Sequence, residues 1–68
     1  MKISARNVLK GKIVDVHKGA TTAHVKIDVG GRVITAAITN ESVDGLGLAA
    51  GKDAYAVIKA SDVMIGVD

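Results

Sequence analysis

Residues 23–29 constrain the fold most strongly, because apolar and polar side chains alternate there without a break. One face carries Ala23, Val25, Ile27 and Val29, and the other carries His24, Lys26 and Asp28. This alternation is typical of a β-strand with one buried and one wetter face. Gly30-Gly31 follows, and both residues tolerate the positive φ angles of a two-residue hairpin turn. The segment therefore predicts an antiparallel sheet.

The segments on either side extend this sheet. Residues 12–18 are rich in β-branched side chains, and Gly19-Ala20-Thr21 predicts a turn into the next strand. Residues 32–39 are expected to form a third strand. They are apolar on both faces, which indicates a central strand or one that a neighbouring subunit covers.

The alternation stops at residues 40–48. Asn40 can cap a helix, acidic residues suit its first turn, and Gly45 or Gly47 can end it. One short helix is expected here.

Two more strands are predicted at residues 54–59 and 63–67, joined by a tight link at Ala60-Ser61-Asp62. Five strands with a helix between the third and fourth match a small all-β Greek-key barrel of the OB type. Residues 1–68 are expected to form a single domain. OB barrels commonly bind oligonucleotides or oligosaccharides, but the fold alone does not fix the function.

The chain is small for its apolar content. Its 68 residues are 49% hydrophobic, with one aromatic residue, Tyr55, and no cysteine. A core of this size is marginal without disulfides or a structural metal, so we expect subunits to cover apolar surface. The lack of cysteine is compatible with a reducing compartment. No apolar run near Met1 resembles a signal peptide or a membrane span, so a cytoplasmic protein without a membrane partner is expected.

A first cluster of hydrogen-bond donors lies near the amino terminus. In an extended chain Ser4 and Arg6 point to the same side. A guanidinium helped by a hydroxyl suits an anion with several acceptor oxygens. The alternative is a solvated leading strand whose arginine pairs with a surface carboxylate.

A second donor cluster follows the strand at residues 54–59. Lys59 stands at its end, and Ala60-Ser61 adds backbone N–H groups and a hydroxyl. Alone, Lys59 could equally be a solvated charge. Together the two clusters favour an oxyanion site.

The two histidines are a possible start of a metal site. If the hairpin turns at Ala20-Thr21, His17 and His24 face each other across the strands. A third ligand is not evident, so no metal site is expected, and surface or pH-responsive histidines are the other interpretation.

Two rival functions are weaker. A nucleic-acid-binding OB module usually carries stacking aromatics and a continuous basic groove. Here the formal net charge is +2 and Tyr55 stands alone, so this remains the alternative function. An enzyme needs a nucleophile or a general base beside its partners. Neither histidine has such a neighbour in an obvious triad, so no catalytic residue is assigned.

Several segments carry a family resemblance that covers nearly the whole chain. They are Ser4-Ala5-Arg6-Asn7, Leu9-Lys10-Gly11, Ile38-Thr39-Asn40-Glu41-Ser42, Leu46-Gly47-Leu48, Gly51 and Ala56-Val57-Ile58-Lys59-Ala60-Ser61-Asp62-Val63-Met64. In this order and spacing they resemble the molbindins, the small Mop-type domains of molybdenum-pterin-binding proteins. The resemblance implies an OB-type protein that binds molybdate or tungstate without an organic cofactor and without catalysis. Its implied role is intracellular molybdenum storage or homeostasis.

The resemblance also implies an assembly and a set of site residues. The molbindins form homohexamers, as trimers of dimers, that hold anions at subunit interfaces. By matching position, Ser4, Arg6, Lys59 and the backbone of Ala60 would bind the anion from one subunit, and Thr39 would come from its neighbour. Ser61 is added as a further hydroxyl. A second interface site near a symmetry axis would lie at the turn formed by Lys18, Gly19 and Ala20.

Overall fold

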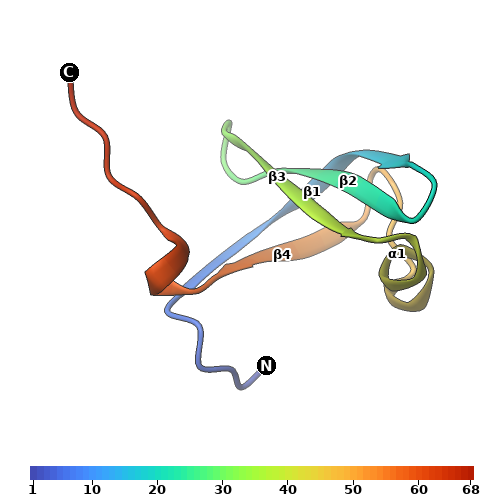
Figure 1. Ribbon diagram of the computed structural model, residues 1–68, viewed down its shortest axis with the longest axis horizontal. Helices are drawn as coiled ribbons and strands as arrows, with labels where there is room; N and C mark the ends of the chain where they lie inside the picture. Colours follow the sequence, from blue (N-terminus) through green and yellow to red (C-terminus); the bar gives the residue numbers. More distant parts are fainter.

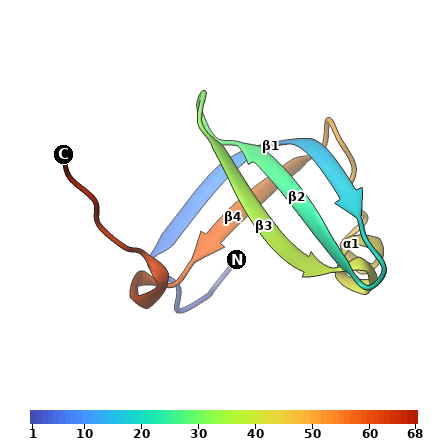
Figure 2. The same cartoon turned by 45° about the horizontal axis from the view of Figure 1, so that its top comes forward.

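The chain folds into one curled antiparallel sheet with a short helix at one end. The computed structural model describes all residues, 1–68. Its elements are β1 (Asn7–Lys18), β2 (Thr22–Asp28), β3 (Val33–Thr39), α1 (Asn40–Leu46), β4 (Asp53–Ile58) and the 3-10 turn η1 (Ala60–Asp62). The strand order is β3-β2-β1-β4. Figures 1 and 2 show α1 at one end of the sheet and η1 at the other.

The long strand β1 joins the two halves of the sheet. It begins at Asn7, earlier than the sequence predicted, and its first half pairs with β4 while its second half pairs with β2. Gly11 lies near the point where the two pairings meet. A Cβ atom on Gly11 would stand 2.3 Å from the carbonyl oxygen of Asp28, so only glycine allows β1 to approach β2 this closely. The register also shifts between Ile13 and Asp15, and such a bulge increases the local twist.

The core is small and aliphatic. Its six buried residues are Ile13, Ala23, Val25, Ile27, Val43 and Ala56, each at most 6% exposed. Three of them are the alternate residues of β2 for which the sequence predicted burial. Val43 comes from α1, which thereby closes one end of the curled sheet.

The hairpin turn predicted at Gly30-Gly31 is confirmed. Gly30 and Gly31 have φ angles of 79° and 92°, and the N–H of Val29 donates to the carbonyl of Arg32 at 2.7 Å. Positive φ at both central residues is what this type of two-residue turn requires.

The helix forms where it was predicted, but a different residue caps it. Thr39, not Asn40, is the N-cap, and its Oγ1 accepts a hydrogen bond from the N–H of Ser42 at 3.0 Å. Asn40 is instead the first helical residue. Its Nδ2 donates to the carbonyl of Gly19 at 2.9 Å, and its Oδ1, the atom that a cap would use, is buried without a hydrogen-bond partner. Gly47, in the left-handed conformation with φ 64°, ends the helix.

One expectation about the sheet is wrong, and one of the two alternatives given for residues 32–39 is excluded. Residues 63–67 form no strand, so the chain has four strands rather than five. After η1 the chain runs away from the sheet (Figure 1), and no strand of the same chain lies beside it. β3 is an edge strand and not a central one, because only β2 pairs with it. Ile34 and Ile38 on one face of β3 pack against the core, whereas Val33 on the other face is exposed and one edge of the strand is unpaired.

No helix of the structure has the length and apolar character needed to cross a membrane.

Candidate functional site

The pairing of β1 with β4 brings the two donor clusters together. The last pair of this ladder is Asn7 with Ile58, and the Nδ2 of Asn7 donates to the carbonyl of Ile58 at 3.3 Å. Arg6 and Lys59 are the next residues along the two antiparallel chains. Positions that lie 53 residues apart in the sequence thus meet at one end of β1. We call Ser4, Arg6, Lys59, Ala60 and Ser61 the donor end.

None of the polar side chains of the donor end has a partner within the chain. Ser4, Arg6, Lys59 and Ser61 are exposed, and they make no side-chain hydrogen bond. The two ion pairs of the chain lie elsewhere, between Lys12 and Asp53 and between Lys18 and Asp44. Arg6 and Lys59 are like charges at the end of one ladder, so they repel each other. An anion between them offsets this repulsion. This arrangement suits an oxyanion.

The backbone of η1 supplies further donors. Its two hydrogen bonds are donated by the N–H groups of Asp62 and Val63, at 2.9 Å and 3.3 Å. The N–H groups of Ala60 and Ser61, at the start of this turn, are not used by it. They lie directly beside Lys59 in the chain, so backbone and side-chain donors occur together at this end of the sheet.

Thr39 lies at the opposite end of the molecule. It pairs with Thr22 at the beginning of β2, next to the last residues of β1, whereas Arg6 and Lys59 lie beside the first. The twelve residues of β1 separate the two places. A single chain therefore does not bring Thr39 to the donor end, and an anion that contacts both must bind between two copies.

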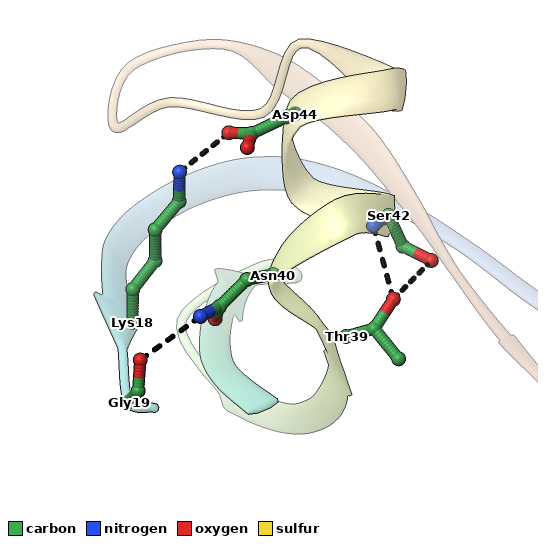
Figure 3. Close-up of polar contacts among 6 residues, drawn as sticks. All are labelled: Lys18, Gly19, Thr39, Asn40, Ser42 and Asp44. Carbon is green, nitrogen blue, oxygen red and sulfur yellow. Dashed lines mark hydrogen bonds and ion pairs between the residues drawn. The ribbon is translucent and has the colours of Figure 1, made fainter. Parts of the chain in front are cut away.

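The hydroxyl of Thr39 is already engaged in its own chain. Figure 3 shows its Oγ1 between the N–H and the Oγ of Ser42, at 3.0 Å and 2.8 Å. Sequence reasoning did not single out Ser42, although the spacing of a helix cap and its third following residue could have indicated it. Ser42 adds a second exposed hydroxyl beside Thr39.

The residues predicted for a second site form a well-bonded turn. The Nζ of Lys18 pairs with the Oδ1 of Asp44, and the carbonyl of Gly19 accepts from the Nδ2 of Asn40 at 2.9 Å (Figure 3). The N–H of Gly19 donates to the carbonyl of Thr22 at 2.8 Å, and Ala20 is exposed at the tip. Lys18, Gly19, Thr39 and Asn40 are called the helix end below.

The histidine pair has the predicted register, since His17 lies directly opposite His24 across β1 and β2. No group of three or more His, Cys, Asp or Glu side chains lies close enough to hold a metal ion.

Comparisons with known proteins find similar sequences and structures. The sequence profile of the TOBE domain family matches residues 3–65. A probable molybdenum-pterin-binding protein of Haemophilus influenzae is 51% identical over 69 residues, which cover 100% of both chains.

Two solved structures share the fold. A molybdate-binding protein from Sporomusa ovata is 36% identical, superposes with a TM-score of 0.94 and matches over 98% of this chain and 100% of its own. The cytoplasmic molybdate-binding protein ModG, solved with molybdate bound, is 45% identical with a TM-score of 0.96, and the match covers all of this chain and 49% of ModG. The resemblance to the Mop-type domains is thus confirmed. The coarser fold, a small all-β domain with a curled sheet and one short helix, agrees with these structures.

Proposed function

The chain belongs to the TOBE domain family, among its molybdenum-pterin-binding proteins, and on this premise we propose that it binds molybdate where copies of the chain meet. Residues 1–68 act as one binding domain in this proposal. Its role is the storage or homeostasis of molybdenum in the cytoplasm, without catalysis and without an organic cofactor. The names of the relatives describe binding of molybdenum-pterin or molybdate, which supports a binding role.

The observation that carries the proposal is the unpaired donor end. Molybdate is a tetrahedral dianion whose metal is already surrounded by oxygen, so it needs hydrogen-bond donors and positive charge rather than protein ligands to the metal. Arg6 and Lys59 supply charge-assisted bonds. Ser4, Ser61 and the backbone N–H of Ala60 supply neutral donors that orient the anion.

Thr39 completes the site from a neighbouring copy. It lies too far from Arg6 within one chain, and the residue is exposed. Its O–H, which donates to the Oγ of Ser42 in the free chain, turns to the anion on binding. The assembly we propose is a homohexamer, built as a trimer of dimers, and the turn at Lys18, Gly19 and Ala20 lines a second class of interface site. The apolar surface that a 68-residue chain leaves exposed supports such an assembly.

Anion size decides the selectivity. Tungstate is nearly equal to molybdate in size and charge, so the donors should bind both. Sulfate is smaller, and a site fitted to the larger ion leaves some sulfate oxygens poorly paired.

Calorimetric titration of the assembled protein with molybdate, tungstate, sulfate and a short single-stranded RNA tests the proposal. We expect saturable heat with the first two ligands and much weaker binding of sulfate. Tight RNA binding without any response to molybdate or tungstate would replace oxyanion binding with a nucleic-acid function.

A further inference from the structure

The exposed face of β1 and β2 carries two histidines that have no partner in the chain. His17 lies in β1 and His24 in β2, and the register places them directly opposite each other. Both residues are exposed, and neither side chain makes a hydrogen bond or an ion pair. Figure 2 shows the second half of β1 beside β2, up to the turn that joins them. The ring nitrogens of this pair are therefore available to a ligand.

The two imidazoles project from the same face of the sheet. In β2 the side chains of Ala23 and Val25 are buried, whereas His24 between them is exposed. His24 thus points away from the core, because successive side chains of a strand point to opposite faces. Residues directly opposite each other in an antiparallel pair share a face, so His17 points outward beside it.

The spacing of the pair suits a chelate. The N–H of Gly19 donates to the carbonyl of Thr22, and hydrogen-bonded pairs alternate with non-hydrogen-bonded pairs along an antiparallel ladder. His17 and His24 lie two positions further along, so they are again a hydrogen-bonded pair, with Cα atoms about 5.5 Å apart. From this separation, rotation about the side-chain bonds allows one nitrogen of each ring to lie about 2.0–2.1 Å from a shared metal ion.

The neighbours of the pair leave room for an ion and do not repel it. On the other side of His24, the opposite residue of β3 is the small, exposed Ala37. One row further along the same face, Asp15 of β1 stands opposite Lys26 of β2. The charges of this carboxylate and this ammonium offset each other, so the adjacent row presents no net positive charge to a cation.

We propose that His17 and His24 together bind one divalent transition-metal ion. Imidazole is a preferred ligand of Cu²⁺, Ni²⁺ and Zn²⁺, whereas Mg²⁺ and Ca²⁺ prefer oxygen. The chain has two histidines and no cysteine, so this pair is its one group of imidazole or thiolate ligands. No third His, Cys, Asp or Glu side chain joins the pair. Water fills the remaining coordination positions, and the ion is exchangeable, unlike that of a closed structural site with four protein ligands.

The metal site goes beyond the proposed function and does not depend on it. The histidines lie in the second half of β1 and in β2, whereas Arg6 and Lys59 lie beside the first residue of β1. A metal ion between the two imidazoles also joins two strands. Since the pair is held together only in the folded chain, the ion should stabilise the fold by mass action.

Calorimetric titration of the full chain with Ni²⁺, in the absence of molybdate, tests the site. We expect saturable binding of one ion per chain. His17→Gln and His24→Gln should each weaken it at least tenfold, because one imidazole loses the gain from holding two ligands on one scaffold. Lys26→Gln is the matched control on the same face and should lose no affinity. Circular dichroism establishes that the variants are folded.

Three results of this titration would overturn the proposal. The first is the absence of saturable Ni²⁺ binding by the wild-type chain, which would leave the two histidines as surface residues. The second is wild-type affinity in either single histidine variant. The third is a ratio of one ion to two chains, because the ion would then lie between copies and not between the two strands of one chain.

Proton NMR identifies the ligands directly, because two histidines give few imidazole signals. A small fraction of an equivalent of Ni²⁺, which is paramagnetic, should broaden the imidazole signals of both His17 and His24, while the ring signals of Tyr55 in β4 stay sharp. Broadening of only one histidine would overturn the chelate. Excess Mg²⁺ should not reverse the broadening, and reversal would assign the ion to carboxylates and reject the site.

Thermal unfolding supplies a readout that needs no ligand signal. Ni²⁺ should raise the Tm of the wild-type chain and of the Lys26→Gln variant, and it should leave the Tm of the double variant with His17→Gln and His24→Gln unchanged. An equal rise in the double variant would overturn the metal site. Molybdate binding is measured separately, so failure of the metal site and failure of the anion site are distinguishable.

Discussion

The two ends of β1 differ in whether their polar side chains have partners within the chain. At the helix end, Lys18 pairs with Asp44, the hydroxyl of Thr39 caps α1, and Asn40 bonds to the carbonyl of Gly19. At the donor end, neither Arg6 nor Lys59 has a partner in the chain. The same fold thus pairs most polar side chains of one end, apart from the buried Oδ1 of Asn40, and leaves those of the other end to a ligand. Polar side chains at the donor end should affect binding, Lys18 should mainly affect stability, and Thr39 should affect both.

The largest effect is expected from removing a cation of the donor end. Arg6→Ala or Lys59→Ala removes a charge-assisted bond to a partly desolvated anion, and we expect molybdate binding to weaken by roughly 2–5 kcal/mol. Lys26→Ala is the matched control, because this exposed lysine of β2 forms no ion pair. Calorimetric titration of the folded variants measures the effect. Wild-type affinity in the Arg6→Ala variant would remove Arg6 from the site.

An intermediate effect is expected at Thr39, which connects the two ends through the assembly. Thr39→Ala removes the N-cap of α1, which should lower the free energy of unfolding by about 1 kcal/mol. It also removes a neutral hydrogen bond to the anion, which is worth about 1 kcal/mol. Thr39→Ser keeps the hydroxyl and is the control.

Urea denaturation and titration separate the two losses at Thr39. If Thr39→Ala lowers stability and leaves molybdate affinity at the wild-type value, the hydroxyl only caps the helix. Thr39 is then not part of the anion site.

The smallest effect is expected from the ion pair of the helix end. Lys18 and Asp44 have side chains that are 45% and 68% exposed, and such surface pairs contribute about 0–1 kcal/mol to stability. We expect Lys18→Ala to lower the free energy of unfolding by no more than this, and the difference from wild type to shrink at high salt. Lys12→Ala, which breaks the other exposed pair, should behave alike. A salt-independent loss well above this range would show that Lys18 is buried in an assembly.

Local patterns predicted most of the sheet. The alternation of residues 23–29 correctly identified the buried face of β2, and Gly30-Gly31 correctly identified the hairpin. Both features depend on neighbours within a few residues. The choice of Thr39 over Asn40 as the cap was missed, because the side chain of Asn40 bonds to Gly19, which is 21 residues away in the sequence.

The strand expected at residues 63–67 shows where such patterns fail. Its β-branched face predicts an extended, buried segment, but a sequence pattern does not say which chain provides the partner. The donor clusters were predictable as two separate groups. Their meeting depends on the register between β1 and β4, which the residue types alone do not reveal.

The central claim is that the anion binds only where copies of the chain meet. Native mass spectrometry over a dilution series, with and without molybdate, tests it most directly. We predict that bound molybdate appears only on oligomers, and that adding molybdate shifts dissociation to lower protein concentration, because a ligand that binds one state stabilises it by mass action. A monomer that carries molybdate with full affinity at every dilution would contradict the account.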